Sequence, residues 1–91
     1  MAIRWRREAA DDQGRIHDYI AEANAPAARS VVGRVLHAVE RLETFPASGR
    51  SGSAKDTREV VIPGLPYIVV YRLLAQDVEV IAVFHAAQDR G

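Results

Sequence analysis

The sequence predicts an α+β fold in which two N-terminal antiparallel helices pack on a mainly antiparallel sheet of about four strands, in the order β-α-α-β-β-β. A short alternating segment comes first, two helical patterns follow, and three strand-like segments fill the second half. The turns between these last three segments are too short for parallel crossovers, so we expect an antiparallel meander with the first strand at an edge. The 91 residues suit one domain, residues 1–91.

The N-terminal third of the chain predicts a strand and a helix. Ile3 and Trp5 alternate with arginines, which is typical of a short strand with one buried face. Residues 7–23 show apolar side chains at three- and four-residue spacing, so they indicate an amphipathic helix. Its predicted buried residues are Ala9, Ile16, Tyr19, Ile20 and Ala23.

A second helix is expected directly after the first. Asn24 can cap it and Pro26 is tolerated in its first turn, and we expect it to run to about Glu43. The following Phe45-Pro46 ends it, because proline disfavours helical geometry in the preceding residue. Its apolar stripe is the clearest periodic signal in the chain: Ala28, Val31, Val32, Val35, Leu36, Val39 and Leu42.

Residues 46–56 form a predicted loop, and three strands follow it. The first strand begins at Thr57 and ends at a tight Pro63-Gly64 corner. Alternation along the next one puts Tyr67, Val69, Tyr71 and Leu73 on one face and Ile68, Val70 and Arg72 on the other. In the last strand, Val78, Val80, Ala82 and Phe84 alternate with Glu79, Ile81, Val83 and His85. Two helices can cover only one face of this sheet, so an apolar face should remain open.

Composition narrows the function classes. The net charge is zero, so bulk charge gives no support for nucleic-acid binding. There are no cysteines, and His17 and His37 have no second ligand at i+4, so we expect no metal and no cofactor. No apolar run approaches the length of a membrane span, and nothing resembles a signal peptide. We therefore expect a soluble, cytoplasmic protein with no membrane partner.

Two groups of polar residues are candidates for chemistry. Arg50, Lys55, Arg58 and Arg72 could converge on a phosphate or carboxylate, or they could instead pair with Asp56, Glu59 and Glu79 across the strands. His85 with Asp89 could act in general acid–base catalysis near neutral pH, or these residues could simply form a polar strand end. Tyr67 and Tyr71 could stack on a partner or belong to the core.

Four segments together resemble the RelE/ParE toxins of bacterial type II toxin–antitoxin systems. They are Ile16-His-Asp-Tyr-Ile-Ala21, Leu42-Glu-Thr-Phe-Pro46 with Gly49-Arg50, Thr57 to Arg72, and Val83-Phe-His-Ala-Ala-Gln-Asp89. The resemblance covers almost the whole chain in order. One departure is Gln13, where the family usually has an apolar residue on the buried face of the first helix.

The resemblance implies a cognate antitoxin as partner. The C-terminal segment of the antitoxin would fold on the toxin and occupy its exposed apolar surface, in a complex expected to form a higher toxin–antitoxin oligomer. For this contact we predict Tyr67, Val69, Tyr71 and Arg72.

The resemblance leaves the target open between two activities. ParE-like toxins poison DNA gyrase and need no nuclease centre, whereas RelE-like toxins cut mRNA on the ribosome without metal. A RelE-like centre would use Arg50, Lys55, Arg58 and Arg72 with His85 or Tyr71. Lys55 is the only lysine, Tyr67 stands near the position where several nuclease members carry a catalytic arginine, and the net charge is zero. These features favour the gyrase poison and leave the enzyme question open. A third hypothesis is a non-toxic module that only binds a partner.

Overall fold

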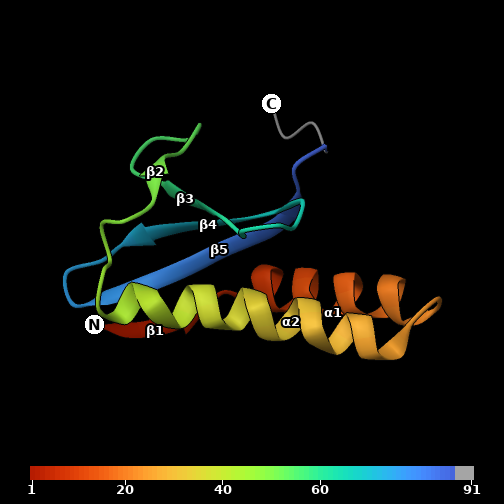
Figure 1. The fold of residues 1–91 in the computed structure, drawn as a ribbon. Coiled ribbons are helices and arrows are strands. Elements are labelled where there is room, and N and C mark those ends of the chain that lie inside the picture. Colours follow the sequence, from red (N-terminus) through yellow and green to blue (C-terminus); the bar gives the residue numbers. More distant parts are fainter. Residues whose placement is uncertain (88–91) are drawn as a thin grey trace.

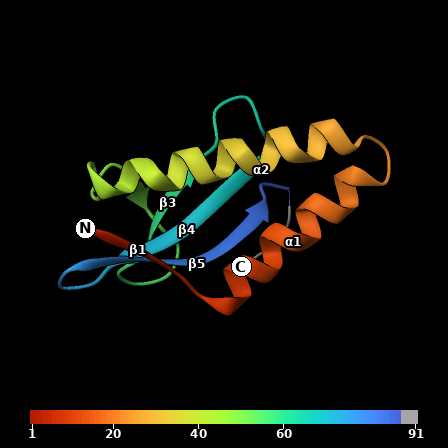
Figure 2. The same ribbon diagram turned by 90° about the horizontal axis from the view of Figure 1, so that it is seen from below.

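The computed structural model describes residues 1–87 as a five-stranded mixed sheet with two helices packed on one face (Figure 1 and Figure 2). β1 pairs with β5 in parallel, the other neighbours are antiparallel, and the order across the sheet is β1-β5-β4-β3-β2. The predicted fold class is confirmed. The elements are β1 (Ala2–Trp5), α1 (Arg7–Ala21), α2 (Ala25–Glu40), a short 3-10 helix η1 (Arg41–Glu43), β2 (Arg50–Ser51), β3 (Arg58–Val61), β4 (Tyr67–Leu73) and β5 (Asp77–His85).

The fifth strand, β2, lies inside the segment predicted as a loop. Arg50 pairs with Glu59 and Ser51 with Arg58, so β2 extends the sheet by only two residues beside β3. A strand of two residues has no alternation of apolar and polar side chains. The prediction of about four strands therefore missed it.

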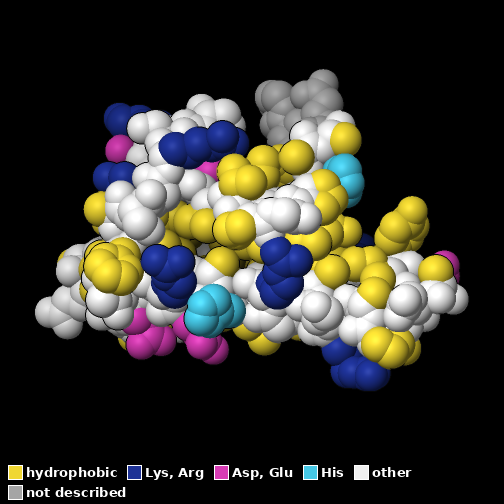
Figure 3. Space-filling view, viewed as in Figure 1, with side chains coloured by type: hydrophobic (Ala, Val, Ile, Leu, Met, Phe, Trp, Pro, Cys, Tyr) yellow, Lys and Arg dark blue, Asp and Glu magenta, His cyan; other side chains and the backbone are white. Residues whose placement is uncertain are grey.

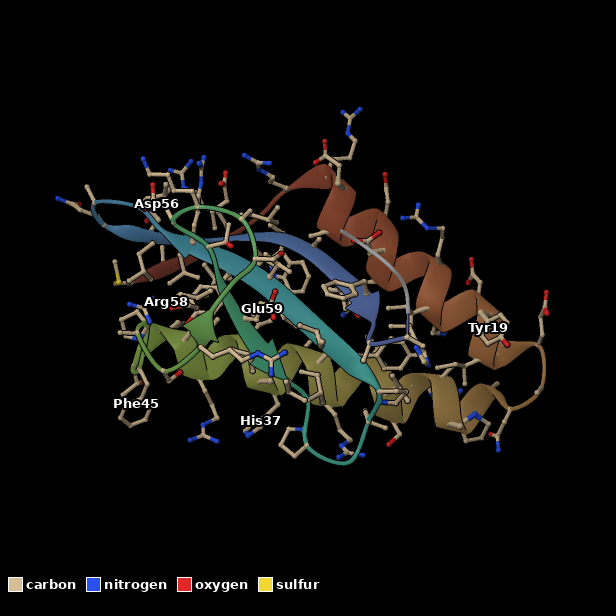
Figure 4. The ribbon with its side chains drawn as sticks, turned by 90° about the horizontal axis from the view of Figure 1, so that it is seen from above. Tyr19, His37, Phe45, Asp56, Arg58 and Glu59 are labelled. Atoms are coloured by element: carbon tan, nitrogen blue, oxygen red, sulfur yellow. The ribbon has the colours of Figure 1, made fainter. Side chains whose placement is uncertain are left out.

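The two helices begin and end close to the expected positions. The side chain of Asn24 accepts a hydrogen bond from the Ala27 amide at 2.9 Å, which confirms it as the cap of α2. α2 ends at Glu40, and its last turn tightens into η1 rather than continuing to Glu43. Tyr19 was predicted to be buried but is 77% exposed near the end of α1 (Figure 4). Within the described residues, neither helix is long and apolar enough to cross a membrane.

The core lies between the helices and one face of the sheet. As predicted, Val69 and Tyr71 share a face with Tyr67, and all three are buried on the helix side. The alternation predicted for the last strand is wrong beyond Val80. Tyr71 pairs with Val80 and Val70 with Ala82, so Ile81 is an extra residue in a β-bulge. After the bulge, Val83 rather than Ala82 packs in the core cluster on the helix side.

The predicted corner between β3 and β4 is confirmed. The Leu65 amide donates to the Ile62 carbonyl at 3.1 Å, and Gly64 has a φ of +75°. This left-handed conformation costs little for glycine and is what a type II turn requires after Pro63. Arg34 of α2 donates to the Pro63 carbonyl, so the helix holds the turn in place.

Helix α1 is joined to the sheet by a carboxylate. β1 ends opposite Val80, and past that point the outer edge of β5 faces α1. There the Val83 amide donates to Asp12 Oδ2 at 2.9 Å, while Arg15 pairs with the other oxygen of Asp12. Asp12 thus takes the place of a strand neighbour and fixes the position of α1 on the bulged part of β5.

Gln13 should be a site of avoidable instability. Its Oε1 atom is buried without a hydrogen-bond partner in the described part of the chain. Because an unsatisfied buried polar atom costs about 1–3 kcal/mol, we expect Gln13→Leu to raise the free energy of unfolding by about 1 kcal/mol. Urea denaturation measures this, and Gln13→Glu, which adds a charge, should do the opposite. A Leu variant no more stable than the wild type would contradict the prediction.

Candidate functional site

The sheet has one face turned away from the helices, as Figure 1 shows, and we call it the open face. Its centre is apolar. The strand register puts five side chains on it: Val61, Ile68, Val70, Ala82 and Phe84. Val61 is 47% exposed, and Val70 and Phe84 are partly exposed. The expected surplus of apolar sheet surface therefore exists, and it is contributed by three adjacent strands.

Ion pairs border the open face. Arg50 approaches Glu59 at 3.2 Å at the β2 edge, where Glu59 projects over the sheet (Figure 4). Near the same end of the strands, but between β4 and β5, Arg72 contacts Glu79 at 2.6 Å, and Arg6 lies 3.4 Å from the same carboxylate. For Arg50 and Arg72, cross-strand pairing is thus the arrangement that the structure adopts.

Glu79 should make stability depend on pH. Burial raises the pKa of its carboxyl, but the hydrogen bond from Arg72 and the charges of Arg6 and Arg72 outweigh this, so the pKa lies below its usual value of 4.5. A depressed pKa contributes stability above about pH 4.5, and this contribution is lost as the pH falls through the folded-state pKa. We expect Glu79→Gln to be about 1 kcal/mol less stable than the wild type at pH 7. In urea denaturation, the difference should shrink towards pH 3, and a constant difference would contradict the assignment.

The predicted cationic cluster is only partly assembled. Lys55, Arg58 and Arg72 line one hollow of about 690 Å³ beside the loop 51–57, but Arg50 does not. Arg58 pairs opposite Tyr71, so its side chain leaves the sheet on the other face from that of Arg72. Its Nη1 donates to the carbonyls of Ala47 and Gly49 at 3.1 and 3.0 Å. The convergence of all four cations on one anion is therefore wrong, because Arg58 holds a loop and Arg72 holds Glu79.

His85 lies at the far end of β4 from Arg72. It pairs opposite Tyr67, whereas Arg72 pairs opposite Glu79. Five residues of strand separate these two positions, which is about 17 Å. The His85 ring stands edge-on to Tyr67 with centroids 5.5 Å apart, and its Nδ1 accepts from the Ala87 amide at 3.0 Å. Its predicted partner Asp89 lies outside the described residues. His85 and the arginines therefore do not share one catalytic centre.

Tyr71 is a structural residue. Its side chain is fully buried, and its hydroxyl accepts from the Gly49 amide and donates to the Pro46 carbonyl, both at 2.8 Å. This hydroxyl therefore ties the start of the 46–57 segment to the centre of the sheet. Both of its hydrogen-bonding roles are already filled, which leaves it unsuited to take a proton from a substrate.

Three of the four residues predicted to contact an antitoxin lie on the face of the sheet that the helices cover. Tyr67, Val69 and Tyr71 are 8%, 0% and 0% exposed because the helices cover them. Arg72 remains accessible on the open face. The strand was correctly expected to use both faces, but its outward side is formed by Ile68 and Val70.

Sequence reasoning also missed residues on α2 and at the start of η1. Arg34, His37 and Arg41 follow one another at helical spacing, and with Gly33 they line a hollow against Ile62 and Pro63. The spacing i, i+3, i+7 is visible in the sequence and could have indicated a basic row. The position of this row beside the β3–β4 turn could not be predicted from the sequence, because that contact joins segments about thirty residues apart.

The fold and the open face define the class of this protein. It is a small α+β protein that covers one face of its sheet with two helices. On the other, apolar face, Val61, Val70 and Phe84 are accessible, whereas Ile68 and Ala82 are buried. Among residues 1–87, the residues proposed for acid–base and phosphate chemistry are spread over both ends and both faces of that sheet.

The chain belongs to the ParE toxin family. Residues 3–90 match the family model described as the ParE toxin of the type II toxin-antitoxin system, parDE. The resemblance noted from the sequence to the RelE/ParE toxins is thereby confirmed.

Individual relatives agree with this assignment. The chain is 44% identical over 86 residues to a protein of Sinorhizobium fredii, Y4kP, whose name describes it as a candidate toxin; the match covers 94% of this chain and 88% of the relative. It is 31% identical over 84 residues to Toxin RelE2 of Caulobacter vibrioides, covering 92% and 93% of the two chains. The fold matches a chain of the chromosomal ParDE toxin–antitoxin system from P. aeruginosa with a TM-score of 0.85 and 20% identity, covering 93% and 95%.

Proposed function

We propose that this protein is a growth-inhibiting toxin that poisons DNA gyrase and is neutralised by a cognate antitoxin. The observation that carries the choice of target is the separation of His85 from Arg72 by about 17 Å of strand. An RNA-cleaving centre needs cations and a proton acceptor around one phosphate. Here the proton acceptor and the cations lie at opposite ends of β4.

The antitoxin is proposed to cover the open face. Val61, Val70 and Phe84 form an apolar surface that a segment folding on the toxin would bury, with Arg72 at its border. The similar P. aeruginosa chain comes from a toxin–antitoxin system, which supports such a partner. We expect the complex to be a cytoplasmic toxin–antitoxin oligomer that can serve plasmid stabilization.

A ribosome-dependent mRNA endonuclease is the second candidate. The hollow shared by Lys55, Arg58 and Arg72 favours it, since these three cations border one space of about 690 Å³. The relative named Toxin RelE2 is consistent with it too. In this case Arg72→Ala should reduce toxicity because it removes a cation from that space.

Growth and enzyme assays separate these candidates. Induction of the chain alone should arrest growth, and the purified protein should inhibit supercoiling of relaxed plasmid by gyrase. His85→Ala and Arg72→Ala should remain folded and fully toxic if gyrase is the target. Unaffected supercoiling together with mapped cuts in mRNA on ribosomes would establish the nuclease instead. A chain that does not arrest growth would be the non-toxic binding module.

The antitoxin surface is tested with two matched substitutions. Val61→Lys places a charge on the open face, and Leu36→Lys does the same on α2, at side chains of similar exposure, 47% and 41%. Only Val61→Lys should weaken antitoxin binding, by at least about tenfold, because it must bury an unpaired charge. Equal affinities of the two variants in calorimetry would contradict the placement.

A further inference from the structure

A groove outside the open face runs between the flank of α2 and the turn that joins β3 to β4. We call it the α2 groove. Its volume is about 320 Å³, and its lining consists of Gly33, Arg34, His37, Ala38, Arg41, Ile62 and Pro63. Neither the gyrase hypothesis nor the antitoxin surface proposed above uses it.

One wall of the α2 groove is cationic. At about 100° per residue, Arg34, His37 and Arg41 fall within about 60° of the circumference of α2 and its extension, so they form one row. Figure 3 shows this row of basic and histidine side chains across the face of the molecule, and His37 projects away from the sheet in Figure 4. No acidic residue lines the groove, and within residues 1–87 neither arginine forms an ion pair. Acidic side chains lie next to this row in Figure 3, but outside the groove lining, and Arg34 also donates to the Pro63 carbonyl. Within its lining the groove therefore carries basic side chains and no acidic one.

The floor of the groove is apolar, and its accessible part is formed by the half-buried Ala38. Ile62 is 1% exposed and lines it together with Ala38. Gly33 lies in the middle of α2, where glycine costs about 1 kcal/mol relative to alanine. A Cβ atom built there would meet no other atom within 4 Å. Packing therefore does not require glycine here, and its missing side chain leaves the groove accessible.

The groove is continuous with the open face around the edge of β3. β2 pairs only with Arg58 and Glu59, so in the described chain Val61 has no strand on its outer side. Val61 faces the open face and the next residue, Ile62, lines the groove. A partner chain that covers the open face and passes over this edge would enter the α2 groove.

We propose that the α2 groove binds an extended, acidic segment of the antitoxin. Carboxylates of the segment would pair with Arg34, His37 and Arg41, and an apolar side chain would rest on Ala38 and Pro63, which lie at the groove surface beside the buried Ile62. An extended chain fits because the groove holds only about 320 Å³. The rise from Arg34 to Arg41 is about 10 Å, which three strand residues span, whereas a helix about 10 Å wide would occupy roughly 800 Å³ over that length. This proposal rests on the proposed antitoxin partner and adds the chemistry of the segment.

A short peptide tests the groove without the antitoxin. The probe is a six-residue peptide of alternating glutamate and valine, titrated into the ¹⁵N-labelled protein, with a lysine–valine peptide of the same length as control. We expect saturable amide shifts at Gly33, His37 and Ile62 with the acidic peptide only. Gly33→Leu should abolish them by filling the groove, and Gly14→Leu, at the equally open glycine of α1, should not. Shifts that are absent, or unchanged in Gly33→Leu, would overturn the proposal.

The antitoxin encoded by the adjacent reading frame tests the physiological partner. We expect the double substitution His37→Glu, Arg41→Glu to weaken its binding at least about tenfold in 0.15 M salt. Arg29→Glu, on α2 but not in the groove lining, should change affinity less than about twofold. Equal affinities of both variants would overturn the proposal. Toxicity of the double variant without antitoxin is measured separately. A chain that is not toxic would contradict the toxin hypothesis, and unchanged antitoxin affinity would contradict the groove proposal.

Discussion

Replacing Tyr71 by phenylalanine is expected to lower the free energy of unfolding by about 3 kcal/mol, the largest effect of any single-atom change considered for this protein. The substitution keeps the ring in the core and removes only the hydroxyl. The buried Gly49 amide then loses its acceptor and the Pro46 carbonyl loses its donor. Each unsatisfied group costs about 1–3 kcal/mol, because water does not reach it. Urea denaturation followed by circular dichroism measures the change.

Tyr19→Phe is the matched control for Tyr71→Phe. Tyr19 is 77% exposed, so water satisfies its hydroxyl and we expect a change within about 0.5 kcal/mol. Gly49→Ala should resemble Tyr71→Phe, since a Cβ atom there would lie 2.6 Å from the Tyr71 hydroxyl and 2.9 Å from the Glu59 carbonyl. A Tyr71→Phe variant as stable as Tyr19→Phe would show that the segment 46–49 does not depend on this hydroxyl.

Replacing Asp12 by alanine is expected to destabilise the protein by about 2 kcal/mol. The Val83 amide would lose a charge-assisted hydrogen bond at a place where β1 no longer covers the edge of β5. Asp12→Asn should cost less, because the amide oxygen can still accept from Val83. Hydrogen exchange of the Val83 amide reports the same contact and should accelerate in Asp12→Ala.

Asp11→Ala is the control for Asp12→Ala. Asp11 is exposed on the same helix, and within the described residues it forms no ion pair, so its removal should change stability by less than about 0.5 kcal/mol. Equal losses of stability in Asp11→Ala and Asp12→Ala would mean that Asp12 contributes only a negative charge on α1, and that its hydrogen bond from Val83 contributes nothing.

The two proposed docking surfaces, the open face and the α2 groove, explain how an antitoxin that wraps around this small toxin could neutralise it. The open face offers apolar area without strong charge at its centre, and the α2 groove offers charge with a small apolar floor. A segment that folds on binding needs a large contact area to offset its ordering entropy. The uncovered edge at Val61 connects the two surfaces without requiring a new fold of the toxin.

Much of the fold followed from local patterns. The apolar stripe of α2, the Asn24 cap and the Pro63-Gly64 corner each depend on neighbours within a few residues, and each is present in the structure. The two-faced character of β4 followed from simple alternation. These features are local, so a single sequence contains all the information that they need.

The candidate site was harder to predict, because its geometry depends on register. Alternation alone could not say which face of β4 the helices cover, and so Tyr67, Val69 and Tyr71 were placed on the partner surface although they form the core. The bulge at Ile81 reversed the second half of β5 for the same reason. A shift of one residue exchanges the two faces of a strand, and only the contacts across the sheet determine it.

The sequence by itself determined that this chain is a small α+β toxin-like protein with more apolar sheet than two helices can cover. Only the tertiary structure decided that Arg58 and Tyr71 hold a loop, that Arg72 holds Glu79, and that His85 lies at the other end of the strand. The physical reason is that hydrogen bonds and ion pairs of these side chains join segments from different strands and loops, and their partners are set by pairing register rather than by spacing along the chain.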